Sequence, residues 1–162
     1  MHNIELLAHR FRNAIESGIS ASDPDIVTDI CFSQFPEGCC GDASELLAQF
    51  LLDHNIKTYY VCGTYGDESF ENMQSHAWLL TEDFMIVDIT GDQFRNDSRF
   101  FFYKHSVYYG KDDAFHKLFD GEDREIRESS GLSNLEIFAQ IRLVELYKSI
   151  CKYLESPPTS FI

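Results

Sequence analysis

The chain has 162 residues, enough for one domain with its own hydrophobic core. Its 27 acidic and 13 basic residues give a formal charge of −14, which repels phosphate backbones, so we expect no nucleic-acid partner. The apolar runs are too short for a membrane span, and residues 1–15 lack the features of a secretory signal. Five cysteines without regular spacing favour reduced thiols and a cytoplasmic protein.

Two stretches in the first third of the chain have the period of amphipathic helices. The first covers residues 4–15, where apolar side chains recur at three- and four-residue steps, and Gly18 is its expected end. The second covers residues 43–51, with Asp42 in its first turn and Asn55 as its expected stop. The sequence therefore predicts that the domain begins with helices.

The middle of the chain changes to short runs of β-branched and aromatic residues, which predict strands at residues 56–62, 76–80 and 84–89. Glu82 and Asp83 form a tight polar connection between the last two runs. We therefore expect these two strands to form an antiparallel hairpin.

The rest of the chain predicts one more sheet region and a closing helix. Residues 99–109 fit a further strand or two about as well as a helix, and the charge-dense residues 120–128 are typical of a solvated surface segment. Apolar positions from Leu135 to Leu154 predict a long helix. No repeat or linker divides the chain, so residues 1–162 are expected to form a single α+β domain with a mostly antiparallel sheet.

Three residue types used in nucleophilic catalysis fall at the junctions of these elements. Cys40 lies just ahead of the second helix, where free N–H groups and the helix dipole favour a thiolate. His76 opens one predicted hairpin strand and Asp88 closes the other, so the carboxylate could orient the imidazole while its second nitrogen faces the thiol. Gln34 could offer its amide, together with the Cys40 N–H, to a developing oxyanion.

The segments FPEGCCGDASELLAQFLL, HAWLL and VDIT resemble the core of the transglutaminase-like cysteine enzymes. That core has a G-x-C-x-D-x-[AS] helix start, a His-Ala-Trp strand and an Asp-x-Thr strand end, in this order. The resemblance covers residues 34–90 and implies a papain- or transglutaminase-like fold. It further implies that Cys40 is the nucleophile, His76 the general base and acid, and Asp88 the orienting carboxylate. The interval from Gln34 to Cys40 is similar to that in papain-like proteases, where a glutamine lines the oxyanion hole.

Simpler roles are open for each of these residues. Cys40 could be a small buried residue, His76 a satisfied strand histidine, and Gln34 a surface or capping residue. Asp88 taken alone could be a turn acid, and its catalytic role depends on the other two. Cys39 could be the nucleophile instead, but Gly38, Asp42 and Ser44 match the pattern only with Cys40 in that place. Because no C-x-x-C or H-x-x-x-H spacing occurs, we expect no metal, and nothing in the sequence calls for another cofactor.

The sequence thus predicts a thiol enzyme that acts on an amide or peptide bond through an acyl-enzyme. The resemblance favours a peptidase or amidohydrolase over a deamidase or transglutaminase. The acidic surface would attract a basic peptide or protein substrate. The alternative is a binding module without catalysis, such as an immunity or adaptor protein for a basic partner, to which the acidity is equally suited. The sequence does not indicate the oligomeric state.

Overall fold

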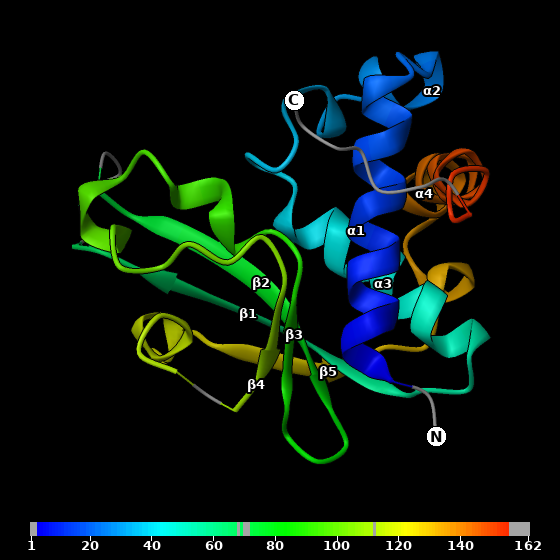
Figure 1. Ribbon diagram of the computed structural model, residues 1–162. Helices are drawn as coiled ribbons and strands as arrows, with labels where there is room; N and C mark the ends of the chain where they lie inside the picture. The colour runs from blue at the N-terminus through cyan, green and yellow to red at the C-terminus, as the bar shows by residue number, and fades with distance from the viewer. Residues whose placement is uncertain (1–2, 68, 70–71, 112, 156–162) are drawn as a thin grey trace.

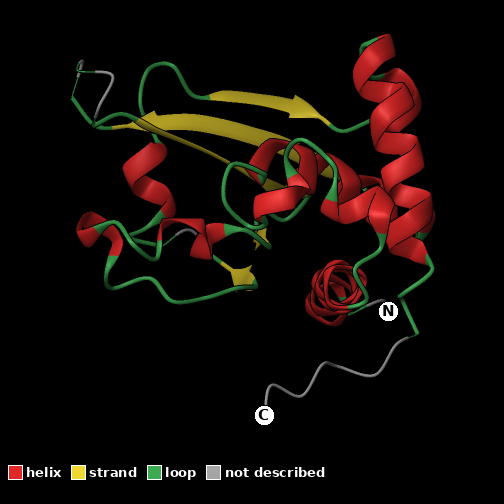
Figure 2. Ribbon diagram, turned by 90° about the horizontal axis from the view of Figure 1, so that it is seen from above, coloured by secondary structure: helices red, strands yellow, loops and turns green. Residues whose placement is uncertain are grey.

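The computed structural model describes residues 3–67, 69, 72–111 and 113–155, and within them four α-helices and five strands form an α+β fold. The helices are α1 (Ile4–Ser20), α2 (Pro24–Val27), α3 (Cys40–Asp53) and α4 (Ile137–Cys151). They gather on one side of the sheet, and the 3-10 turns at residues 91–94, 98–100 and 116–119 lie on the other (Figures 1 and 2). The α+β class predicted from the sequence is confirmed.

Helix α1 begins where the Asn3 side chain accepts the Leu6 N–H, which satisfies one of the unpaired donors of the first turn. The prediction that Gly18 ends this helix is wrong, because α1 continues to Ser20. A Cβ atom at position 18 would lie 2.3 Å from Cδ1 of Ile26, so the glycine allows α2 to pack closely against α1. The predicted stop of the next helix is confirmed, since α3 ends at Asp53 and Asn55 adopts a positive φ of 59°.

All strand pairings in the described sheet are antiparallel, in the order β4-β3-β2-β1-β5. The strands are β1 (Thr58–Tyr65), β2 (Gln74–Thr81), β3 (Ile86–Asp88), β4 (Tyr108–Gly110) and β5 (Glu125–Glu128). The predicted β2–β3 hairpin is confirmed, with Leu79 opposite Val87 and Leu80 opposite Ile86. The predicted surface segment at residues 120–128 includes β5, an exposed edge strand.

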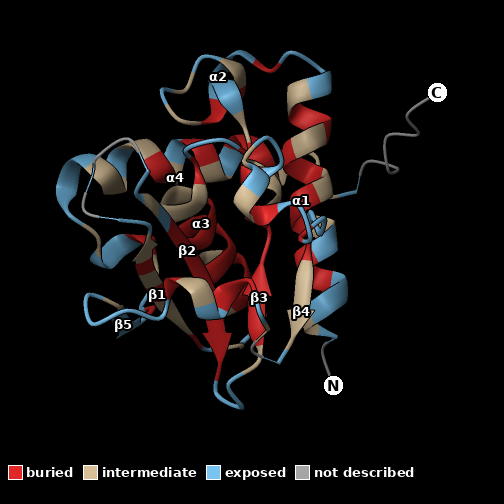
Figure 3. Ribbon diagram, turned by 90° about the vertical axis from the view of Figure 1, so that its left-hand side faces the viewer, coloured by how far each residue is buried: buried red, intermediate tan, exposed pale blue. Residues whose placement is uncertain are grey.

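The sheet has a separate hydrophobic core on each face. Figure 3 shows that the ribbon of α3, β2 and β3 is largely that of buried residues. On the helix side, α1, α3 and α4 bury large side chains such as Phe11, Leu47 and Leu146. The opposite face is covered by aromatic residues from the 3-10 turns η2 (Gly91–Phe94), η3 (Ser98–Phe100) and η4 (His116–Phe119), together with Tyr103 and Phe115. The chain at residues 99–109, which fitted strand or helix equally, contributes the end of η3 and the start of β4.

The closing helix α4 packs against α1, α2 and α3. Its Arg142 pairs with Asp42 in the first turn of α3 at 2.5 Å and with Asp29 at 3.0 Å, so α4 is tied to the segment that carries Cys40. In the described part of the chain, no helix combines the length and the apolar character needed to cross a membrane.

Candidate active site

Cys40 and Cys39 are adjacent but lie in different surroundings. Cys40 is the first residue of α3 and is partly buried, whereas Cys39 is buried and donates its thiol to the carbonyl oxygens of Cys31 and Glu37. Burial raises the pKa of the Cys39 thiol to about 12. Cys39 is therefore held as an inert thiol, and Cys40 is the cysteine that is free to take part in chemistry.

The β2–β3 hairpin brings His76 and Asp88 together. Leu79 pairs with Val87, so the next position along puts Trp78 level with Asp88, and His76, two residues before Trp78, lies on the same face of the sheet. The Nε2 atom of His76 lies 2.7 Å from Oδ2 of Asp88, and both side chains are almost fully buried. Because a carboxylate only accepts hydrogen bonds, Nε2 of His76 carries a proton and donates a hydrogen bond to Asp88.

The Nδ1 atom of His76 therefore remains for Cys40 and for a residue that the sequence did not single out. Gln93, on η2, has its side-chain nitrogen 2.8 Å from Nδ1. Strand β3 pairs with Leu79 and Leu80 of β2 and ends at Asp88, so the β2–β3 ladder does not reach Ala77. The N–H of Ala77 donates to the sulfur of Cys40. The thiol thus reaches the histidine past the end of β3.

These contacts decide the charges of the site. Burial alone would raise the pKa of the Cys40 thiol, but hydrogen bonding and charge attraction from His76, with the Gln93 amide and the Ala77 N–H, lower it below its ordinary value. Burial alone would lower the pKa of His76, but the Asp88 carboxylate and Cys40 raise it to about 9. The arrangement stabilises the thiolate form of Cys40 and the charged form of the His76 ring.

A second histidine contacts the same carboxylate. His116, on η4, places Nε2 2.8 Å from Oδ2 of Asp88 and Nδ1 2.8 Å from Oδ1 of Asp113. The other Asp88 oxygen, Oδ1, accepts the Thr90 N–H at 2.9 Å. Burial would raise the pKa of Asp88, but the charges and hydrogen bonds of the His76 and His116 imidazoles hold it well below its usual range.

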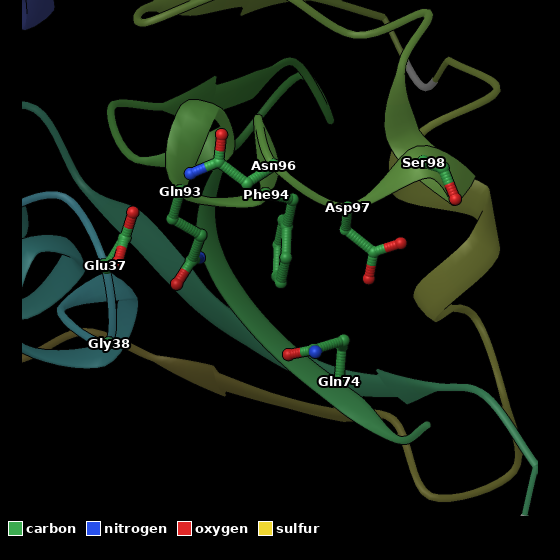
Figure 4. Close-up of a pocket in the computed structure, with 8 residues that line it drawn as sticks. All are labelled: Glu37, Gly38, Gln74, Gln93, Phe94, Asn96, Asp97 and Ser98. Carbon is green, nitrogen blue, oxygen red and sulfur yellow. The ribbon is translucent and has the colours of Figure 1, made fainter. Parts of the chain in front are cut away.

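A cleft of about 520 Å³ opens beside the cluster. In Figure 4, Glu37 and Gly38 lie on one side of it, Asp97 and Ser98 on the other, and Gln74 at its base. Two of its lining residues connect it with the cluster, since Gly38 is two residues before Cys40 and the side chain of Gln93 contacts His76. Its lining is mostly polar, with carboxylates and carboxamides, and it could receive a polar segment of a substrate.

The structure brings together three of the four residues predicted from the sequence: Cys40, His76 and Asp88. Gln34 is exposed at the end of η1 (Phe32–Gln34) and stays outside the hydrogen-bonded cluster formed by the described residues, so its role at an oxyanion stays a prediction. Gln93 is the amide that contacts the site. It follows Asp88 by five residues, and only the fold of η2 turns it back onto His76.

No metal-binding spacing occurs in the sequence, yet His76, Asp88 and His116 offer ligand atoms that all lie within 4.8 Å of one another. Two histidines and a carboxylate are donors that suit zinc or iron(II). Here, however, both Nε2 atoms approach the same oxygen at 2.7 and 2.8 Å, which is hydrogen-bond geometry. A metal bound by all three groups would have to displace both protons.

Comparison of the chain with models of protein families, with curated proteins and with solved structures found no match.

Proposed function

We propose that this protein is a thiol enzyme in which Cys40 attacks an amide or peptide bond, with His76 as the base and acid and Asp88 as the orienting carboxylate. The observation that carries the proposal is the His76 ring, which donates to Asp88 through Nε2 while its other nitrogen serves Cys40. A histidine held in this way has the tautomer needed to exchange a proton with the thiol. A papain- or transglutaminase-like core belongs to the same proposal.

The reaction begins when the Cys40 thiolate attacks the carbonyl carbon of the substrate. The oxyanion forms near the free N–H groups at the start of α3 and the Gln93 amide, which are donors suited to a developing negative charge. The imidazolium then gives its Nδ1 proton to the departing nitrogen, the C–N bond breaks, and a thioester remains on Cys40. Water or an amine, losing its proton to Nδ1, attacks the thioester, and the C–S bond breaks to restore the thiolate.

The cleft supports a polar and preferably cationic substrate. Glu37 and Asp97 line it, and the whole chain carries a formal charge of −14. Long-range attraction would raise the association rate of a basic peptide or protein, an effect that salt weakens. Whether water or an amine resolves the thioester depends on the acceptor, and both outcomes use the same three residues.

Thiol reactivity tests the proposal without knowledge of the substrate. We expect iodoacetamide near neutral pH to modify Cys40 at least about tenfold faster than a free thiol, because Cys40 has the larger thiolate fraction. Peptide mapping assigns the rate to each cysteine. Substitution His76→Asn should slow the modification of Cys40 by about 100-fold, since the imidazolium that stabilises the thiolate is lost.

The neighbouring cysteine provides the matched control. Cys39→Ser keeps a donor for the carbonyl oxygens of Cys31 and Glu37 and should leave the fast reaction intact. An activated ester such as p-nitrophenyl acetate should then leave one acetyl group on Cys40, detected by intact mass, and none in Cys40→Ala. If all five cysteines react at the rate of a free thiol, the enzyme proposal fails and an acidic binding module is the better interpretation.

A further inference from the structure

His116 contacts Asp88 through Nε2, in addition to His76, and a triad does not require this second histidine. It is 1% exposed, and its ring centre is 6.0 Å from that of His76. Asp113 accepts from the ring at Nδ1 and also accepts the backbone N–H of His116 at 2.8 Å. The ring is therefore fixed at both ends, between one carboxylate in the site and one outside it.

Both ring nitrogens of His116 face carboxylate oxygens, and a carboxylate oxygen only accepts hydrogen bonds. A neutral imidazole has one donor nitrogen and one acceptor nitrogen, so it could satisfy only one of the two contacts. A doubly protonated ring satisfies both. Its positive charge also compensates two carboxylates in a region with little access to water, where unpaired charge is costly.

We propose that His116 is a buried imidazolium that positions Asp88 and shares its negative charge with His76. This inference rests on the proposed function, and it makes His116 and Asp113 positioning residues for the thiol site. The cluster then runs Asp113, His116, Asp88, His76, Cys40, with alternating charge. Without His116, the whole charge of Asp88 would act on His76 and would hold its proton more tightly, at the expense of its transfer to the leaving group.

The groups around His116 leave the two carboxylates as its partners for a proton. The rings of Trp78, Tyr103, Tyr108 and Phe115 surround it, with centres between 4.9 and 5.8 Å from its own. Arg124 lines a small cavity beside it and pairs with Asp120. Close packing of η4 on the sheet keeps this arrangement, because a Cβ atom at Gly63 would lie 2.0 Å from the Phe119 carbonyl oxygen.

The charge state of His116 is read directly from the nitrogen resonances of its ring. In 15N-labelled protein, an imidazolium shows two protonated ring nitrogens, whereas a neutral ring shows one protonated and one bare nitrogen. At about pH 7.5 an ordinary histidine is mostly neutral, and we expect His116 to be doubly protonated. A bare nitrogen on His116 at this pH would overturn the proposal.

Asp113→Asn tests what this charge does, because the side chain is 25% exposed and an asparagine can still accept the His116 N–H. The amide gives Nδ1 a donor, so the ring can become neutral and still donate to Asp88 through Nε2. We then expect the titration of His76 to move upward by about one pH unit, because the nearer positive charge is gone. If His116 kept its charge, loss of Asp113 alone would move that titration downward, and this result would contradict the proposal.

Two controls separate this inference from the proposed function. Asp120→Asn removes one carboxylate without touching His116 and should leave the His76 titration in place. His116→Gln keeps a donor for Asp88 without the charge and should reproduce the upward movement in protein shown to be folded by circular dichroism. The His76 titration is measurable even if Cys40 proves unreactive, so failure of the enzyme proposal leaves the test intact. An unchanged titration in both variants would reduce His116 to a structural residue.

Discussion

Gln93 lies with its side-chain nitrogen 2.8 Å from Nδ1 of His76, on the edge of the ring that serves the Cys40 thiol. Its N–H groups can donate to Nδ1 of a neutral ring or to the thiolate. Gln93 therefore acts on the charge of the sulfur as well as on the position of the ring.

The first prediction follows from this contact. Gln93→Met keeps the length of the side chain and removes its donors, so the pKa of Cys40 should rise and its iodoacetamide rate near neutral pH should fall by roughly three- to tenfold. The pH profile of the rate measures the change. Asn96→Ala, which alters another carboxamide of the cleft, is the control. An unchanged profile in Gln93→Met would show that the amide does not act on the thiol.

The second prediction concerns stability and the raised pKa of His76. The unfolded value is near 6.5 and the folded value is about 9, so the charged ring stabilises the fold fully below pH 6.5. That contribution is lost as the pH rises through about 9. The contribution of the charged ring to the unfolding free energy is about 3 kcal/mol, because a shift of one pKa unit corresponds to about 1.36 kcal/mol.

Urea unfolding of the wild type and of His76→Gln across this range measures the effect. The difference in unfolding free energy should be largest below pH 6.5 and should shrink as the pH approaches 9. His9→Gln, which changes an exposed histidine on α1, should reproduce the wild-type curve. A difference that grows with rising pH would have the wrong sign and would contradict the imidazolium at position 76.

The third prediction separates the proton cluster from a metal centre. If His76, Asp88 and His116 share protons, then dialysis against EDTA should leave the fast alkylation of Cys40 unchanged. Added zinc that entered the cluster would displace the protons of both imidazoles and should slow the reaction. Loss of reactivity in EDTA, restored by zinc and accompanied by one bound metal per chain, would assign the cluster to metal binding instead.

The fourth prediction concerns the packing of η4. Gly63→Ala would place a methyl group 2.0 Å from the backbone oxygen of Phe119, so η4 would have to move away from the sheet. We expect a loss of unfolding free energy of roughly 1–3 kcal/mol and a weaker contact between His116 and Asp88. Gly121→Ala, which meets only the flexible Asp123 side chain, is the control. Equal stability of the two variants would show that η4 adjusts without cost.

Local patterns of the sequence were enough for the elements that bear the predicted site. The period of α3, the hairpin turn at Glu82 and Asp83, and the β-branched and aromatic runs of β2 and β3 depend on neighbouring residues. They placed Cys40 at the start of α3 and Asp88 at the end of β3 correctly, whereas His76, predicted to open its strand, is the third residue of β2, which begins at Gln74. Gly18 misled the prediction because its role lies in a contact with Ile26, which no local pattern records.

The rest of the cluster was decided by tertiary structure. Gln93 contacts His76 and His116 contacts Asp88, both from 3-10 turns whose sequence signals are weak. His116 is 28 residues from Asp88 along the chain. Their positions depend on how the aromatic core on the second face of the sheet packs η2 and η4, and that packing involves contacts between distant residues. The sequence by itself therefore determined the α+β class and singled out Cys40, His76 and Asp88, whereas only the folded core decided which other groups share their protons.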